Sequence, residues 1–232
     1  MSARDTISAE PTEPSIRTRR VLVWDVPTRL FHWLMVVLVA GAYLTERLNS
    51  MDWHVRIGEA LLALVVFRLL WGWVGSGTAR FGSFLASPAA ALVHLRRMFR
   101  RETDSQVGHN PAGGWMVLVL LALLLSEALS GVYVNNDVAN QGPLTNWVPA
   151  SVANAITDLH AVLWDVLLAA VAVHISAIAF YAAKGQHVLR PMLTGHKILP
   201  LGTSGPRLAS NWLALALLAA GALIAALASR YL

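Results

Sequence analysis

The sequence predicts an all-α membrane protein with five transmembrane helices. Among its 232 residues, 56% are hydrophobic and only 13% are charged, a balance typical of polytopic membrane proteins. Five apolar stretches, residues 27–47, 53–74, 113–134, 156–183 and 208–231, are long enough to cross a hydrocarbon core of about 30 Å. We expect the first four to form a four-helix bundle and the fifth to be an extra C-terminal helix.

The first span and the segment before it define the expected domain organisation. Asp25 and Pro27 are a typical helix start, because Asp can cap free amides and Pro in the first turn needs no N–H. No small-x-small cleavage site precedes Thr45, so we expect a retained span rather than a signal peptide. Residues 1–20, with little apolar surface, are expected to be disordered. The bundle is then assigned to residues 21–197, and a linker with the fifth helix to residues 198–232.

Loop charges predict the orientation of the spans. Lys and Arg are concentrated in the N-terminal segment, the second loop and the fourth loop, namely Arg4, Arg17, Arg19, Arg20, Arg80, Arg96, Arg97, Arg100, Arg101, Lys184, Arg190, Lys197 and Arg207. By the positive-inside rule these segments lie in the cytoplasm. The first loop, with Glu46, Arg47 and Asp52, the third loop, with Asp137, and the C-terminus are then periplasmic, as in a multi-pass protein of a bacterial inner membrane. The net charge of +5 reflects this topology and forms no stripe suited to nucleic acid.

Tryptophans gather near the ends of the spans. Of the nine in the chain, seven are Trp24, Trp53, Trp71, Trp73, Trp115, Trp147 and Trp212. Such positions are typical of the aromatic belts at membrane interfaces, and we expect these residues to act as anchors.

Four of the eight histidines, His32, His54, His160 and His174, fall within predicted spans, where imidazoles are costly and therefore informative. His160 and His174 are fourteen residues apart, so a helix separates them by about 21 Å on nearly one face. The span directions place His54 with His160 near the periplasmic side and His32 with His174 near the cytoplasmic side. The loop charges that set these directions are independent of the histidines.

Paired imidazoles at two depths favour two haem irons, each with two axial histidines. The chain has no cysteine, which excludes thiolate-bound iron–sulfur clusters and covalent c-type haem attachment through C-x-x-C-H. Iron with two axial histidines has no open position for substrate and suits one-electron transfer. For any single histidine, an interhelical hydrogen bond or a proton relay is an alternative. The four together predict a haem-binding bundle.

Two arginines lie where they can serve the inner of these haems. Arg68, fourteen residues after His54, is expected on nearly the same face and at the depth of His174. It is placed to pair with a haem propionate. Arg29, three residues before His32, is a second candidate for this role or for binding an anionic lipid. For Arg29, snorkelling to the headgroups is the alternative.

Three acids, Glu59, Glu127 and Asp165, fall in the outer third of their spans. Because buried carboxyls can titrate near neutrality, this set predicts a proton route coupled to quinone chemistry. Pairing with Arg56, or hydrogen bonding between helices, is the alternative.

Several motifs resemble one family of membrane proteins. The segment V-L-V-W-D-V-P-T-R-L-F-H-W at residues 21–33 is similar to the opening of the bacterial cytochrome b561 and nickel-iron hydrogenase b-type cytochrome family. Further matches are His54-x-x-x-Gly58, Arg68, Arg80-Phe81, Gly108-His109-Asn110-Pro111, His160 with His174, and Met192-x-x-Gly195-His196, so the resemblance covers roughly residues 21–197.

The resemblance implies an integral cytochrome with two haem b groups and with His32, His54, His160 and His174 as axial ligands. It also implies electron exchange between ubiquinone or menaquinone and a partner, either a periplasmic c-type cytochrome or a hydrogenase-like subunit. It leaves open a quinol:acceptor oxidoreductase activity and a homodimer. The fifth helix departs from the family's four-span pattern, and we expect it to serve packing or partner docking.

Two other classes of function compete with this interpretation. A small transporter or proton channel would use the intramembrane His, Glu and Arg residues to line a polar pathway, but the spans show no inverted halves and no broken helices. A haem-free membrane anchor would leave the matched depths of the four histidines unexplained.

Overall fold

The computed structural model describes residues 17–97, 106–135 and 142–230. In this part of the chain, five helices are long and apolar enough to cross a membrane: α1 (Val26–Arg47), α2 (Met51–Val74), α5 (Pro111–Gly131), α6 (Ala150–Ala183) and α8 (Asn211–Arg230). The five predicted spans are therefore confirmed. Residues 1–16, Arg100, Arg101, Asp137 and Tyr231, which entered the predictions above, lie outside the described residues.

The long helices begin where the sequence offers caps. Asp25 Oδ1 accepts a hydrogen bond of 2.7 Å from the amide of Thr28 at the start of α1, which confirms the predicted cap. Asp25 Oδ2 accepts a second hydrogen bond, 3.2 Å long, from Trp71 Nε1, and this bond joins α1 to α2. Asn110 caps α5 in the same way, by accepting from the amide of Gly113 at 2.7 Å. The helix starts are thus set by side chains next to the apolar runs.

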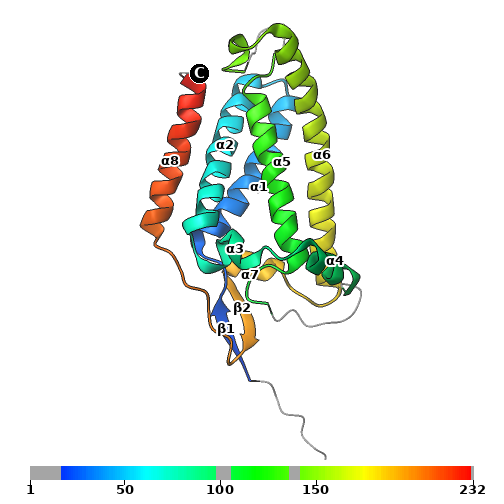
Figure 1. The fold of residues 1–232 in the computed structure, drawn as a ribbon, viewed down its shortest axis with the longest axis vertical. Helices are drawn as coiled ribbons and strands as arrows, with labels where there is room; N and C mark the ends of the chain where they lie inside the picture. The colour runs from blue at the N-terminus through cyan, green and yellow to red at the C-terminus, as the bar shows by residue number, and fades with distance from the viewer. Residues whose placement is uncertain (1–16, 98–105, 136–141, 231–232) are drawn as a thin grey trace, which may run out of the picture.

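Helices α1, α2, α5 and α6 form the bundle, and α2 is the most buried of them (Figure 1). The core of the bundle consists of Met35 from α1, Leu64 and Val65 from α2, Leu124 from α5, and Leu167 from α6. Because each of the four helices contributes, the apolar side chains join them into one unit.

The fifth span, α8, packs lengthwise against α2 (Figure 1). Ala214 of α8 packs with Phe67, Trp71 and Ala79. A Cβ atom at Gly221 would lie 2.6 Å from the carbonyl oxygen of Ala63, so the two backbones approach closely only because residue 221 is glycine. Packing on the bundle therefore accounts for one face of this helix.

Short elements connect the spans. They are η1 (Gly77–Ala79), α3 (Phe81–Phe84), α4 (Pro88–Arg97), η2 (Thr145–Trp147) and α7 (Leu189–Thr194). In addition, β1 (Thr18–Leu22) pairs antiparallel with β2 (His196–Pro200), and Leu22 lies opposite His196. We call the end of the bundle that carries β1, β2 and α7 the hairpin end (Figure 1).

The β1–β2 ribbon changes two of the expected boundaries. Thr18, Arg19 and Arg20 belong to β1 and not to a disordered segment, and the expected boundary between residues 197 and 198 falls inside β2. Val21, Val23, Trp24 and Leu199 form a small apolar cluster at this site. Such a pairing is not visible locally, because its two strands are separated by the whole bundle in the sequence.

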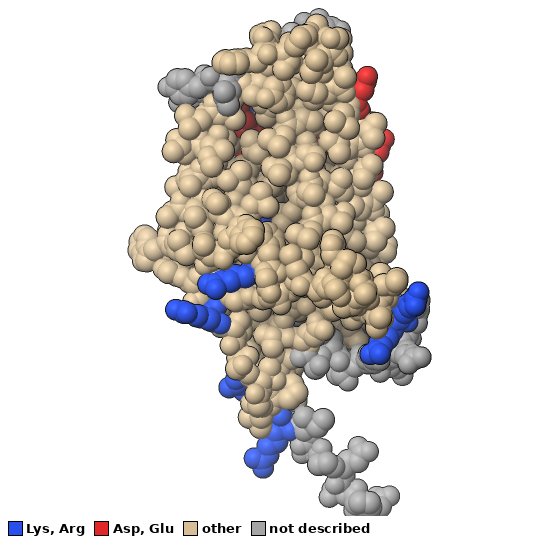
Figure 2. All heavy atoms as spheres, viewed as in Figure 1, with Lys and Arg blue, Asp and Glu red and all other residues tan. Residues whose placement is uncertain are grey.

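Charge and tryptophan positions differ between the two ends. Figure 2 shows Lys and Arg gathered at the hairpin end and Asp and Glu toward the opposite end, as the loop charges predicted. The tryptophans are mixed: Trp53, Trp73, Trp147 and Trp212 are exposed, which fits anchoring, whereas Trp24 and Trp71 are buried. For Trp24 and Trp71 the anchor prediction is wrong, because Trp24 packs in the apolar cluster at the ribbon and Trp71 packs with Phe67, Ala79 and Ala214.

Candidate functional site

Two histidines from different helices meet at the hairpin end. The rings of His32, on α1, and His174, on α6, have centres 6.5 Å apart and planes inclined by 56°. His32 Nδ1 is buried and has no hydrogen-bond partner among the described residues. We call His32 and His174 the inner pair. The two histidines of the inner pair come from α1 and α6, helices that do not follow one another in the sequence.

Contacts with α7 hold α1 in place beside the inner pair. Arg29 Nη1 donates a hydrogen bond of 2.8 Å to the carbonyl oxygen of Leu193, and Trp33 Nε1 donates one of 3.4 Å to that of Met192. Both donors flank His32 on α1. Arg29 is therefore engaged by the protein itself and does not simply extend to the headgroups.

His54, on α2, and His160, on α6, lie close enough to interact electrostatically, and we call them the outer pair. His54 Nδ1 lies 3.0 Å from the carbonyl oxygen of Ala42. A carbonyl oxygen can only accept, so Nδ1 carries the proton and Nε2 keeps its lone pair.

His160 has the same tautomer for a different reason. Its Nδ1 lies 2.8 Å from Ser130 Oγ, and that hydroxyl donates its one hydrogen to the carbonyl oxygen of Glu127 at 2.9 Å. Ser130 must then accept from His160 Nδ1–H, which leaves the lone pair on Nε2, the nitrogen that lies 3.4 Å from Glu127 Oε1. Both imidazoles of the outer pair are thus in the form that binds metal ions through Nε2.

Two glycines shape the space around the outer pair. A Cβ atom at Gly131 would lie 3.2 Å from His160 Cε1, so a larger residue there would press on the imidazole. Gly58 lies one turn after His54 and is only partly exposed, yet a Cβ atom there would meet no atom within 4 Å. The structure therefore has open space beside Gly58, one helical turn from His54.

The three predicted acids differ in burial and in their contacts. Glu127 is at the outer pair, with Oε1 3.4 Å from His160 Nε2 and with Oε2 buried and lacking a partner among the described residues. Asp165 is exposed on α6, and Glu59 is partly buried on α2. The guanidinium of Arg56 lies 5.4 Å from the centre of the Trp53 ring, and in the described part of the chain it forms no salt bridge with these acids. Among the salt bridges of the described residues, Glu127 is the one of these three acids that contacts a histidine of the outer pair.

Arg68 occupies a buried site near the inner pair. Arg68 is only 3% exposed, and its guanidinium lies 5.3 Å from the centre of the Phe81 ring. Nη1 has no hydrogen-bond partner among the described residues. A buried guanidinium with an unused donor is suited to bind an anionic group.

Comparison with known proteins identifies the family. The model for the prokaryotic cytochrome b561 family matches residues 23–195, which is most of the chain. The chain belongs to the prokaryotic cytochrome b561 family. The match contains all four span histidines and ends before α8.

A relative within the curated proteins agrees with this membership. The chain is 23% identical over 235 residues to a protein named "Probable Ni/Fe-hydrogenase B-type cytochrome subunit" from Rhizobium leguminosarum bv. viciae, with 85% of this chain and 98% of the relative covered. No solved structure matches the chain. As a member of the cytochrome b561 family, it is a multi-pass membrane b-type cytochrome that acts in electron transfer, with haem b as its cofactor.

Sequence reasoning missed one residue of this cytochrome. The sequence analysis gives His109 no role of its own, yet its ring packs on Trp24 and Phe84, with ring centres 4.6 Å and 4.8 Å away. Its Nδ1 is buried and has no partner among the described residues. The signal that could have drawn attention to it is the motif Gly108-His109-Asn110-Pro111, which leads into α5 and ends on its first residue.

Proposed function

We propose that this cytochrome holds two haem b groups, one at the inner pair and one at the outer pair, and passes electrons across the membrane. The separation of the inner rings carries this proposal. An imidazole nitrogen binds a transition metal at about 2 Å, and the ring centre lies roughly 1 Å behind that nitrogen, so two rings on opposite sides of one ion have centres about 6 Å apart. The centres of His32 and His174 are 6.5 Å apart, which fits an iron between them.

The outer pair fits the same chemistry through its hydrogen bonds. Ligand histidines usually donate their other N–H to a carbonyl or hydroxyl oxygen, which fixes the tautomer and the ring orientation. Ala42 does this for His54, and Ser130 does it for His160. The open space at Gly58 leaves room beside His54. When bound between two histidines, haem b supplies one-electron redox chemistry.

Helix α6 sets the separation of the two sites. His160 and His174 are fourteen residues apart on this continuous helix, which is a rise of about 21 Å. The two pairs therefore lie toward opposite surfaces of a hydrocarbon core of about 30 Å. This arrangement supports electron transfer from one side of the membrane to the other.

For orientation, we propose that the hairpin end lies in the cytoplasm and that the C-terminal end of α8 lies at the periplasm of a bacterial inner membrane. The Lys and Arg residues at the hairpin end in Figure 2 support this orientation through the positive-inside rule.

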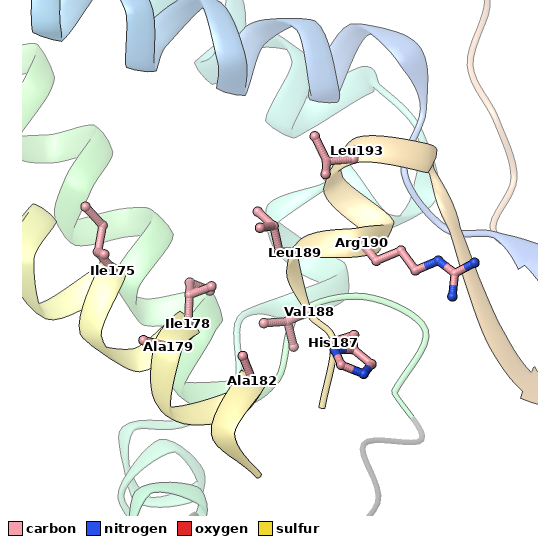
Figure 3. A pocket seen from close by; sticks show the side chains of 9 residues that line it. All are labelled: Ile175, Ile178, Ala179, Ala182, His187, Val188, Leu189, Arg190 and Leu193. Atoms are coloured by element: carbon pink, nitrogen blue, oxygen red, sulfur yellow. The ribbon is translucent and has the colours of Figure 1, made fainter. Parts of the chain in front are cut away.

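A groove at the hairpin end supports the assignment of quinone as one redox partner. It has a volume of about 560 Å³ and is lined by Ile175, Ile178, Ala179, Ala182, His187, Val188, Leu189, Arg190 and Leu193. Figure 3 shows the apolar side chains of α6 facing those of Val188 and α7, with Arg190 pointing away. The groove begins one residue after His174. Apolar walls with few polar groups suit the ring and isoprenoid chain of a quinone.

The other redox partner is proposed to be a periplasmic c-type cytochrome or a hydrogenase-like subunit. The relative from Rhizobium leguminosarum bv. viciae, which its name describes as a hydrogenase cytochrome subunit, supports the second of these. For the acids, we restrict the proposed proton role to Glu127, because it borders the outer pair.

Haem stoichiometry tests this proposal most directly. The purified protein should bind two haem b per chain by the pyridine haemochrome assay, and quinol should reduce them. His160→Ala and His174→Ala should each lose one haem, whereas His196→Ala, in strand β2, should keep both. One haem per chain in the native protein, or two in His160→Ala, would refute the two-site assignment. Full reduction by dithionite without reduction by any quinol would refute quinone as the partner.

A further inference from the structure

Buried polar atoms without partners are concentrated at the hairpin end. Of the six such side-chain atoms in the described part of the chain, one is Glu127 Oε2 at the outer pair. The other five are Thr28 Oγ1, Arg29 Nε, His32 Nδ1, Arg68 Nη1 and His109 Nδ1. Buried polar groups in native proteins are nearly always hydrogen-bonded, so this concentration indicates a bound group that the chain itself does not supply.

The chemistry of these atoms identifies that group as an anion. Arg68 and Arg29 can only donate hydrogen bonds, and Thr28 and His109 can donate as well. The carboxylate that interacts electrostatically with Arg68 is that of Asp25. Both of its oxygens are already used, by the amide of Thr28 and by Trp71 Nε1. The site therefore sets the two guanidinium groups of Arg68 and Arg29 against one carboxylate, and it has spare donors.

His109 lies near both Arg68 and the inner pair. It interacts electrostatically with Arg68, His174 and His32. Burial, followed by the charge of Arg68, lowers the pKa of His109 to about 3. The imidazole is thus neutral in the protein alone and has one N–H to donate. The rings of Trp24 and Phe84 hold it in place.

We propose that His109 and Arg68 together bind a carboxylate, a propionate of the haem at the inner pair. This inference rests on the proposed function, which places a haem between His32 and His174. In this role Arg68 supplies the charge, and His109 supplies a directed hydrogen bond. A lipid phosphate is another anion with matching chemistry, and the experiment below separates the two.

Midpoint potentials test the role of His109. Loss of a donor to a propionate destabilises the reduced haem, whose total charge is more negative. His109→Leu should therefore keep both haems. The midpoint potential of the inner haem should fall by about 59 mV, which corresponds to a tenfold change in its ratio of reduced to oxidised form. The outer haem serves as an internal control for folding. His109→Gln, which keeps a donor, should restore most of the potential, and Arg68→Met should lower it at least as much as His109→Leu does. His196→Leu is the matched control and should change neither potential.

Infrared difference spectra identify the bound anion. With haem labelled with ¹³C at the propionates, the labelled carboxylate band should shift in His109→Leu and in Arg68→Met. Two haems whose potentials and propionate bands are unchanged in both variants would overturn the inference and leave the proposed function standing. Unchanged bands with potentials that differ between nanodiscs with and without phosphatidylglycerol would assign the anion to a lipid and also overturn it. A native protein without two haems would instead overturn the proposed function.

Discussion

Replacement of Ser130 by Ala tests how the outer histidine is oriented. Ser130 is buried at 7% exposure, and its hydroxyl accepts the 2.8 Å hydrogen bond from His160 Nδ1. Loss of a typical hydrogen bond costs about 1 kcal/mol, and the buried N–H left without a partner adds to this cost. Affinity for the outer haem should therefore fall by about fivefold or more, within the roughly 10–100-fold range known for such second-sphere changes.

The same change should alter the redox potential of one haem only. A histidine that donates Nδ1–H to an oxygen is a more basic ligand, which favours oxidised iron. Ser130→Ala should therefore raise the midpoint potential of the outer haem and leave the inner haem unchanged, because His174 does not contact Ser130. Ser130→Thr keeps the hydroxyl and is the matched control.

Redox titration and haem transfer to apomyoglobin measure both effects. The wave that is missing in His160→Ala identifies the outer haem. If Ser130→Ala moves the inner wave, or leaves both the transfer rate and the two potentials at their native values, the tautomer argument for His160 is wrong.

Three further substitutions follow from the geometry. Gly131→Val should selectively weaken or abolish binding of the outer haem, measured by haem stoichiometry, because a Cβ atom there lies 3.2 Å from His160 Cε1. Gly221→Leu should lower the free energy of unfolding by roughly 1–3 kcal/mol, measured by denaturation in detergent, because Cβ would lie 2.6 Å from the Ala63 carbonyl oxygen; both haems should remain. Ile178→Trp should fill the groove and slow quinol-driven reduction at least tenfold, while reduction by dithionite is unchanged.

Matched controls separate local effects from general damage. Gly82→Ala should be neutral, because a Cβ atom at Gly82 meets no atom within 4 Å. Val162→Trp places the same bulk on an exposed position of α6 that does not line the groove. If Val162→Trp slows quinol oxidation as much as Ile178→Trp does, the groove is not the quinone site.

The family and the helical architecture were predictable because their signals are local. Span length follows from runs of apolar residues, and the start of α1 follows from Asp25 next to Pro27. The depths of the histidines follow from a constant helical rise and from the loop charges. The sequence motifs then indicated the family to which the matched model assigns the chain.

The tertiary structure added the contacts that depend on how the helices are rotated and paired. Hydropathy does not reveal that Ser130 accepts from His160, that Asp165 faces outward while Glu127 faces His160, or that β1 pairs with β2. The tertiary structure also buries His109 against Trp24 and Phe84, although these three residues lie in different segments of the sequence.

The amino-acid sequence alone therefore determined how many helices are long and apolar enough to cross a membrane and how far apart His160 and His174 lie along their helix, because both follow from local hydropathy and a regular helical repeat. Only the tertiary structure decided which side chains surround each imidazole. That choice depends on the packing of helices distant in the sequence, through contacts such as those of Leu64, Leu124 and Leu167 in the common core.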